Sequence, residues 1–211
     1  MPRGLVIIGG GGHALVVAEA AIAAGAPIAG FLDDDPFAPL SAGAPRADRL
    51  GGFDRLDLLR DPAFAWIIAI GDLDARRGLL ARLAALDPPP PVSVVHPTAV
   101  VSASASIEPG VFVAPGAIVH TRARIGEHAI VNTGAIVEHE CRVGVNVHLA
   151  PGSVLGGRAA VGADTLVGLG SRVLPGVHIG SRCVVGAGAV VTENVADDRL
   201  AIGVPAVSRV R

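Results

Sequence analysis

Aliphatic residues recur at every sixth position through the second half of the chain. From Val95 to Val191, seventeen consecutive positions spaced by six hold Val, Ile or Leu without exception. The residue two places before each of them is Ser, Ala, Val, Cys or Thr, so a register of small residues accompanies the aliphatic one. A period of six with one aliphatic and one small residue predicts a parallel β-helix built from hexapeptide repeats.

In this architecture three hexads close one triangular coil, so that residues 18 positions apart lie in neighbouring coils. The aliphatic side chain fills the narrow interior and the small residue fits the tight corner. Seventeen hexads correspond to between five and six coils, stacked at the ~4.8 Å spacing of hydrogen-bonded strands.

The first part of the chain follows a different pattern, in which short apolar runs alternate with alanine- and leucine-rich segments. It predicts strands at Leu5–Ile8, Ile28–Leu32 and Ala65–Ile70, and helices at Ala14–Ala24 and about Asp74–Leu86. This alternation predicts a small parallel sheet in a Rossmann-like α/β domain. The prolines at 88–91 predict a stiff linker, which gives domains at 1–90 and 91–211.

Polar turns follow each predicted strand of the first domain. Their residues are Gly11, Gly12, His13, Asp33, Asp34, Gly71 and Asp72. Ligands of parallel sheets bind beyond the carboxyl ends of the strands, so we expect these turns to converge on one site.

Composition narrows the function classes. Hydrophobic residues make up 51% of the chain and aromatic residues only 3%, as a narrow solenoid interior requires. The formal net charge of −2 offers no basic surface for nucleic acid or an anionic membrane. No apolar run is long enough for a membrane span and no signal peptide is evident, so we expect a cytoplasmic protein.

Both cysteines, Cys141 and Cys183, occupy the small inward register. We therefore interpret them as buried structural thiols rather than nucleophiles.

Chemically active residues cluster on the outside of the predicted β-helix, at Asn132, Glu138, His139, Glu140 and His148. Glu140 can orient the imidazole of His139 and raise its basicity. One coil later the chain has Gly156 and Gly157, which remove side chains from the wall beside the imidazole. The resulting slot suits a thioester, whose carbonyl oxygen could face the backbone N–H of Gly157.

The glycine turn leaves several interpretations open. Gly9-x-Gly11-x-x-Ala14, with Asp33 at the expected distance, nearly satisfies the dinucleotide fingerprint. The domain has only half the size of a full dinucleotide fold, which favours a mononucleotide whose phosphates bind the amides of Gly11 to His13. A glycine turn that only packs helix against strand is the third interpretation.

Metal catalysis is disfavoured. Trimeric β-helices that act as zinc carbonic anhydrases place two histidine ligands five residues apart, and this chain has no His-x4-His spacing.

At this point several motifs together resemble one family, the sugar O/N-acyltransferases. The motifs are Gly9-Gly10-Gly11-Gly12-His13-Ala14-Leu15-Val16-Val17, Phe31-Leu32-Asp33-Asp34, Ala69-Ile70-Gly71-Asp72, Val95-His96-Pro97, Asn132-Thr133, Glu138-His139-Glu140-Cys141 and Gly203-Val204-Pro205-Ala206. This family includes the bacillosamine- and perosamine-pathway acetyltransferases and sialic-acid O-acetyltransferases. The resemblance covers essentially the whole chain.

The resemblance implies a homotrimer of left-handed β-helices with acetyl-CoA bound between neighbouring chains and no metal. It implies N-acetylation of the 4-amino group of a nucleotide-linked amino-dideoxy sugar, with His139 as general base and Glu140 as its partner. It further implies CoA contacts from His148, Gly157, Leu169 and Ala187, and nucleotide-sugar contacts from Gly11, Gly12, His13, Asp33, Asp34, Gly71 and Asp72.

Alternatives remain at this stage. O-acetylation of sialic acid or another sugar hydroxyl needs the same base, and a non-catalytic trimeric scaffold or a dinucleotide-binding module would use the same folds. Trimerisation is also expected on physical grounds, because an outward apolar strip with Leu166, Val184 and Val190 favours burial against a second copy.

Overall fold

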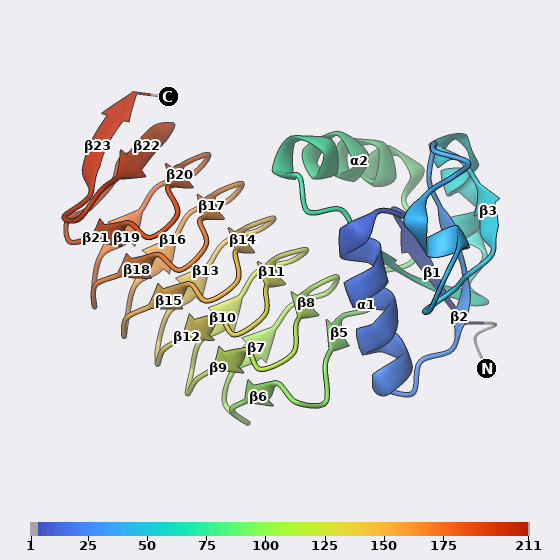
Figure 1. Ribbon diagram of the computed structural model, residues 1–211, viewed down its shortest axis with the longest axis horizontal. Helices are drawn as coiled ribbons and strands as arrows, with labels where there is room; N and C mark the ends of the chain where they lie inside the picture. Colours follow the sequence, from blue (N-terminus) through green and yellow to red (C-terminus); the bar gives the residue numbers. More distant parts are fainter. Residues whose placement is uncertain (1–3, 211) are drawn as a thin grey trace. The chain divides into compact units, whose positions relative to one another are not determined.

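The computed structural model describes residues 4–210 and contains two compact units. The first unit ends at Pro97 and the second begins at Thr98. Figure 1 shows an α/β unit formed by the N-terminal part of the chain and a stack of coils formed by the rest.

The N-terminal unit is built on a parallel sheet of four strands in the order β3-β2-β1-β4. Its elements are β1 (Gly4–Ile8), α1 (Gly12–Ala23), β2 (Ile28–Leu32), the 3-10 helix η1 (Pro39–Ser41), β3 (Arg49–Gly51), the 3-10 helix η2 (Phe53–Arg60), β4 (Phe64–Ile68), α2 (Leu73–Leu86) and β5 (Val94–Val95). The predicted strands and helices of this unit are confirmed, with shifts of one or two residues at their ends.

The apolar core explains this arrangement. Buried side chains of the sheet meet those of η2 and α2 in one cluster, which contains Val6, Ile8, Leu32, Leu56, Leu59, Trp66, Ile68, Leu79 and Leu83. β3 and η2 were not predicted from the sequence. β3 has only three residues and its register against β2 is irregular, so it carries no recognisable alternation.

The proline-rich segment after α2 is held in place by Trp66. Its indole Nε1 donates a hydrogen bond to the carbonyl of Pro89 at 2.7 Å, and its own carbonyl accepts from Val92 N at 3.0 Å. The segment predicted as a stiff linker is therefore anchored to β4.

The second unit is a parallel β-helix with three sheets, each named here by its first strand in this unit. The β6 sheet contains β6 (Val100–Val101), β9 (Ile118–Val119), β12 (Ile136–Val137), β15 (Val154–Leu155), β18 (Arg172–Val173) and β21 (Val190–Val191). The β7 sheet contains β7 (Ser106–Ile107), β10 (Arg124–Ile125), β13 (Arg142–Val143), β16 (Ala160–Val161) and β19 (His178–Ile179). The β8 sheet contains β8 (Phe112–Val113), β11 (Ile130–Val131), β14 (His148–Leu149), β17 (Leu166–Val167), β20 (Val184–Val185), β22 (Arg199–Ile202) and β23 (Val207–Val210).

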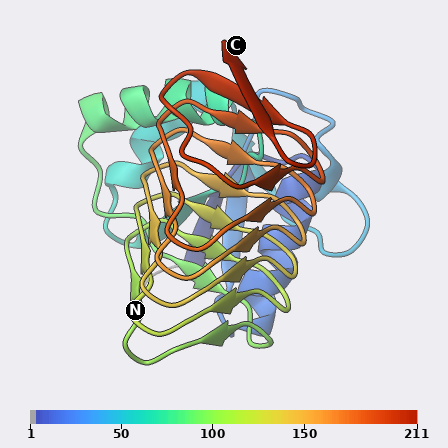
Figure 2. The same ribbon diagram turned by 90° about the vertical axis from the view of Figure 1, so that its left-hand side faces the viewer.

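The coil length follows from the strand register. Ile125 pairs with Val143 and Val143 with Val161, so each residue lies beside the one 18 positions further along. Figure 2 shows the coils stacked one on the next. The aliphatic and small registers are buried from Val111 onward, whereas Val101 and Ile107 in the first coil are half-buried. The predicted β-helix and its coil length are confirmed.

The corners of the β-helix from Gly110 onward each use one residue with a positive φ angle. From Gly110 to Gly188 the residue before each small inward residue is in the left-handed region, over fourteen consecutive hexads. Seven of the fourteen are glycine and the others are Arg122, His128, Glu140, Asn146, Arg158, Asp164 and Arg182. Non-glycine residues are strained in this conformation.

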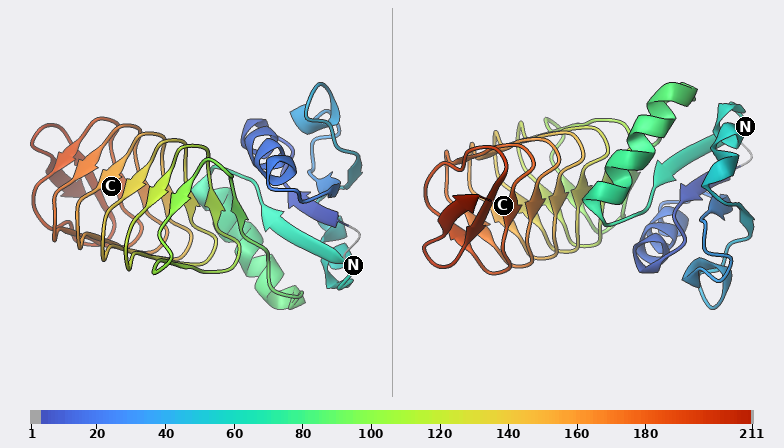
Figure 3. Two further views of the ribbon diagram at one scale, coloured as in Figure 1. Left: turned by 90° about the horizontal axis from the view of Figure 1, so that it is seen from below. Right: turned by 90° about the horizontal axis from the view of Figure 1, so that it is seen from above.

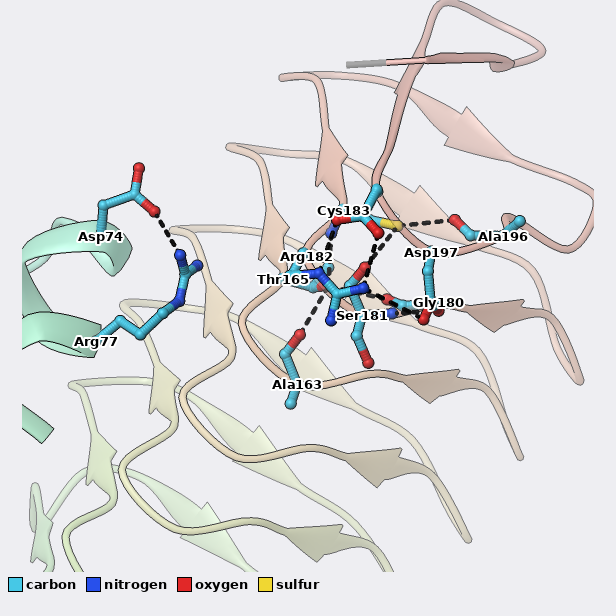
Figure 4. A network of polar contacts seen from close by, with 11 residues as sticks. Asp74, Arg77, Ala163, Thr165, Gly180, Ser181, Arg182, Cys183, Ala196 and Asp197 are labelled. Atoms are coloured by element: carbon cyan, nitrogen blue, oxygen red, sulfur yellow. Dashed lines mark hydrogen bonds and ion pairs between the residues drawn. The ribbon is translucent and has the colours of Figure 1, made fainter. Parts of the chain in front are cut away.

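The two thiols are structural, as predicted. Cys141 is fully buried and donates a hydrogen bond from Sγ to the Gly156 carbonyl at 3.1 Å, and burial raises its pKa to about 11. Figure 4 shows Cys183, whose Sγ donates to the Ala196 carbonyl at 3.0 Å and whose N–H donates to Thr165 Oγ1 at 3.0 Å. Burial also raises the pKa of Cys183. Both groups therefore stay protonated and unreactive near neutral pH.

Ser153→Ala is expected to raise the free energy of unfolding by about 1 kcal/mol, because it removes a buried hydroxyl. Ser153 Oγ has no hydrogen-bond partner among residues 4–210. Ser171 fills the same column one coil later and donates from Oγ to the Gly168 carbonyl at 2.7 Å. Ser171→Ala should therefore lower stability, and the two denaturation midpoints should move in opposite directions. A lower midpoint for Ser153→Ala would contradict the prediction.

The C-terminal segment extends the β-helix beyond the last hexad. β22 extends the β8 sheet, and Ala201 pairs with Val185. β23 then runs antiparallel to β22 and forms the hairpin visible in Figure 3. Arg209 lies in β23, and Arg211 lies outside the described residues.

Neither α-helix in residues 4–210 has the length and apolar character needed to span a membrane.

Candidate functional site

The predicted polar turns of the N-terminal unit gather at one edge of its sheet. Ile8, Leu32 and Ile68 are aligned in register on parallel strands. The segments with Gly11, Gly12 and His13, with Asp33 and Asp34, and with Gly71 and Asp72 follow these three residues directly. Carboxyl ends of parallel strands form the usual ligand site of such sheets.

The start of α1 is open to a ligand. Gly11 is its N-cap residue and supplies no side-chain cap, and the first turn contains no acidic residue. A Cβ added at Gly11 or Gly12 would meet no atom within 4 Å. No side chain of Gly11 or Gly12 covers the start of the helix, and a helix N-terminus without an acidic cap suits an anionic group.

The three aspartates have backbone partners that the sequence analysis did not foresee. Asp33 Oδ2 accepts from Gly10 N at 2.6 Å and its Oδ1 accepts from Asp35 N at 2.8 Å. Asp34 Oδ1 accepts from Phe53 N at 2.7 Å, and Asp72 Oδ1 caps α2 by accepting from Ala75 N at 2.8 Å. These carboxylates hold the turns in shape, and each oxygen retains a second lone pair for a ligand.

Arg76 is a structural residue of this edge that the sequence analysis missed. It is 1% exposed, donates from Nη1 to the Ile70 carbonyl at 3.2 Å, and burial lowers its pKa to about 10. Its position in the sequence could have predicted its burial, because Arg76 lies on the same face of α2 as Leu79 and Leu83, the other two buried residues of the helix. Its guanidinium braces the segment that leads from β4 to Asp72.

His139 and Glu140 lie at a corner of the β-helix, between β12 and β13. His139 Nδ1 and Glu140 Oε2 are 3.3 Å apart, and both side chains are about half exposed. A carboxylate only accepts hydrogen bonds, so this contact places the imidazole proton on Nδ1 and leaves a lone pair on Nε2. The pair has the form of a base oriented by an acid.

Gly157 lies directly beside the imidazole, as the 18-residue spacing predicts. Its neighbour Arg158 donates its N–H to the His139 carbonyl at 2.9 Å, which sets the two coils in register. A Cβ added at Gly157 would overlap the imidazole, with Cε1 at 2.7 Å. Gly156 is needed for a different reason, because a Cβ there would lie 2.7 Å from Pro175 N. Only the absence of a side chain at Gly157 lets Nε2 occupy its position.

His148 is oriented by Asn132. Asn132 Oδ1 accepts from Thr133 N at 2.8 Å, so its Nδ2 is the group that donates to His148 Nε2 at 3.0 Å. The proton of a neutral His148 ring therefore lies on Nδ1. This ordered pair lies in the β8 sheet, whereas His139 follows a strand of the β6 sheet.

Leu169 and Ala187 occupy a further corner. Both are exposed and follow β17 and β20 of the β8 sheet, and Gly188 N donates to the Leu169 carbonyl at 2.8 Å. Gly157 follows β15 of the β6 sheet. The residues expected to contact CoA are thus divided within one chain between two corners and one face.

Glu140→Gly is expected to raise the free energy of unfolding by about 1 kcal/mol, because Glu140 has a φ of +60° that glycine adopts without strain. Arg122→Gly is the matched variant, since Arg122 has a φ of +57° at the same corner one coil earlier. Denaturation midpoints of both should rise. A lower denaturation midpoint for Glu140→Gly alone would show that the contact of Glu140 with His139 stabilises the fold by more than the positive φ destabilises it.

Comparison with known proteins supports one family. The N-terminal residues 4–83 match the model of the PglD N-terminal domain, and residues 152–193 match that of the hexapeptide repeat of succinyl-transferase. No curated protein matched in a search of full sequences.

Solved structures match over the whole chain. A perosamine N-acetyltransferase of Caulobacter crescentus, crystallised with CoA and GDP-perosamine, is 40% identical over 99% of this chain and 97% of its own, with a TM-score of 0.90. The acetyltransferase domain of PglB from Neisseria gonorrhoeae, in complex with acetyl coenzyme A, is 33% identical over 99% of this chain and 100% of its own, also with a TM-score of 0.90. The chain therefore belongs to the sugar acyltransferases of the hexapeptide-repeat type.

Proposed function

We propose that this protein transfers the acetyl group of acetyl-CoA to the 4-amino group of a nucleotide-linked 4-amino-4,6-dideoxy sugar. The relatives support it, because the Caulobacter enzyme is named for N-acetylation of perosamine and was crystallised with CoA and GDP-perosamine. The observation that carries the mechanism is the imidazole of His139, oriented by Glu140 and set over Gly157.

In the proposed reaction the sugar amine attacks the thioester carbonyl directly. The N–C bond forms as Nε2 of His139 removes a proton from the amine, and the C–S bond then breaks. The CoA thiolate leaves and accepts a proton from the imidazolium. A neutral amine is already a good nucleophile, so alignment and one proton transfer suffice without a covalent intermediate.

Glu140 would stabilise the imidazolium that forms during this step. Two of the Caulobacter structures carry a substitution of a histidine, by asparagine in one and by alanine in the other, which fits a functional histidine in the family. The backbone N–H of Gly157 donates to no residue of the described chain, so it would bind the thioester oxygen as negative charge develops.

The open edge of the N-terminal sheet would bind the nucleotide sugar. The amides of Gly11, Gly12 and His13 would face its phosphates, and the free lone pairs of Asp33 and Asp34 would accept from hydroxyl or base N–H groups. Gly71 and Asp72 would complete the site. Both cysteines are free thiols and acetyl-CoA is the cosubstrate, so we place the reaction in the cytoplasm.

The proposed active enzyme is a homotrimer. His139 and Gly157 lie at one corner of a chain, while His148, Leu169 and Ala187 lie on another face and corner. In the proposed trimer one acetyl-CoA would contact both groups in the groove between two chains. The apolar outward residues also divide, with Leu166 and Val184 on the β8 sheet and Val190 on the β6 sheet. The predicted single strip is thus two faces, as contact with two neighbours requires.

The acceptor can be identified by release of free thiol from acetyl-CoA. The panel would contain UDP- and GDP-linked 4-amino-4,6-dideoxy sugars, with sialic acid alongside. Release with an amino sugar supports N-acetylation and identifies the nucleotide. Release with sialic acid alone would replace the proposal by O-acetylation, and light scattering that gives a mass near the 21.1 kDa of one chain would contradict the trimer.

A further inference from the structure

Four arginines surround Glu140 on the β-helix. Arg122 and Arg158 occupy the same corner position as Glu140 in the coils before and after it. Arg124 and Arg142 lie in the adjoining β7 sheet and are directly paired between β10 and β13.

This arrangement lowers the stability of the fold. Like charges directly opposite each other on paired strands repel, as Arg124 and Arg142 must. Arg122 and Arg158 in addition adopt positive φ angles of +57° and +62°. Uncharged residues at the four positions, with glycine at the two corners, would give the same coils without either penalty.

The four guanidinium groups are not paired with a carboxylate. None of them forms an ion pair or a side-chain hydrogen bond with any residue of 4–210, and Glu140 is directed to His139. Arg182 differs, because its guanidinium donates to both carboxylate oxygens of Asp198 at 2.7 Å. Positive charge on the four guanidinium groups is therefore left available beside the catalytic corner.

A hollow lies between these side chains. Arg122, Arg124, Glu140 and Arg142 line a volume of about 130 Å³. It adjoins a second hollow of about 410 Å³ that shares Arg122 and Arg124 and is otherwise lined by Ser104, Ser106 and Glu108. The glutamate there accepts from Ser106 Oγ at 3.0 Å.

We infer that Arg122, Arg124 and Arg142 form an anion site that binds a phosphate group of a substrate beside the catalytic base. Guanidinium groups bind phosphate through paired N–H donors, and an anion between Arg124 and Arg142 would remove their repulsion. The inference rests on the proposed function. Two substrates carry phosphate: the acceptor's diphosphate is one sugar ring away from the reacting amine, whereas the phosphates of CoA lie beyond its pantetheine arm.

Steady-state kinetics of Arg124→Gln, Arg142→Gln and the double variant test the site. We expect KM for one substrate to rise at least about tenfold per lost guanidinium, with kcat within threefold of the wild type. A rise for the nucleotide sugar assigns the site to the acceptor diphosphate, and a rise for acetyl-CoA assigns it to the cofactor phosphates. Arg182→Gln is the control, because its charge is already neutralised by Asp198.

Thermal unfolding with inorganic pyrophosphate tests the site without turnover. Pyrophosphate should raise the Tm of the wild type more than that of the double variant, and the Tm of the double variant without ligand should equal or exceed that of the wild type. Equal pyrophosphate effects together with unchanged KM values would overturn the inference. A lower ligand-free Tm for the double variant would instead show a structural role. If the wild type transfers no acetyl group, the proposed function fails while the pyrophosphate comparison still decides the anion site.

Discussion

His139→Ala is expected to lower kcat by about 100- to 10,000-fold, the usual contribution of a positioned general base. The reason is geometric: Nδ1 is engaged with Glu140 at 3.3 Å, and Nε2 lies over Gly157 with its lone pair available. The dissociation constant of CoA should change little, because the imidazole acts on the amine. The measurements are thiol release under saturating substrates and equilibrium binding of CoA.

His120→Ala is the matched control, because His120 is exposed and precedes the same type of corner one coil earlier. Its turnover should equal that of the wild type. Turnover of His139→Ala within threefold of the wild type would remove His139 from the mechanism. A loss of CoA binding together with turnover would indicate that the side chain organises the groove rather than moves a proton.

Gly157→Ala is expected to reduce kcat by about 100-fold through displacement of the base, since small misplacements of reacting groups have effects of this size. The three atoms nearest to the added methyl group all belong to the His139 ring, with Cε1 at 2.7 Å and Cδ2 at 3.1 Å. The backbone around Gly157 is not crowded by the methyl group, so the variant should fold with a Tm close to that of the wild type.

The double variant Gly157→Ala/His139→Ala tests the cause of this loss. If the methyl group acts by moving the imidazole, Gly157→Ala should have no further effect once the ring is gone, and the two losses should not add. Additive losses would mean that residue 157 contributes independently, as a donor to the thioester oxygen or as part of the CoA groove. Both outcomes are read from the same thiol-release assay.

The β-helix was predictable in detail because its contacts are regular along the chain. A period of six sets the strands, and the addition of 18 to a residue number identifies its neighbour in the next coil. For that reason the position of Gly157 beside His139 followed from counting. The buried thiols of Cys141 and Cys183 were predictable on the same basis, as members of the small inward register.

The N-terminal unit was less predictable because its contacts join segments that are distant in sequence. Asp33 and Asp72 were expected to face a ligand, and the structure shows that they also hold Gly10 and the start of α2. The short strand β3 and the helix η2 depend on packing against β2 and α2, which no local pattern reports. The burial of Arg76 was not predicted, because an arginine in a helix is expected at the surface unless the carbonyl groups that accept its hydrogen bonds are known.

The sequence by itself determined the two folds, the coil length, the pair of His139 and Glu140 and the glycine beside them. The tertiary structure decided which corner each outward residue occupies. The position of a residue within its hexad predicts that its side chain points outward. All three faces of the coil share this repeat, however. The closed coil places His139 and Gly157 on one corner, apart from His148, Leu169 and Ala187. It also showed that the four arginines around Glu140 are not paired with a carboxylate, because the direction of each side chain does not follow from the repeat.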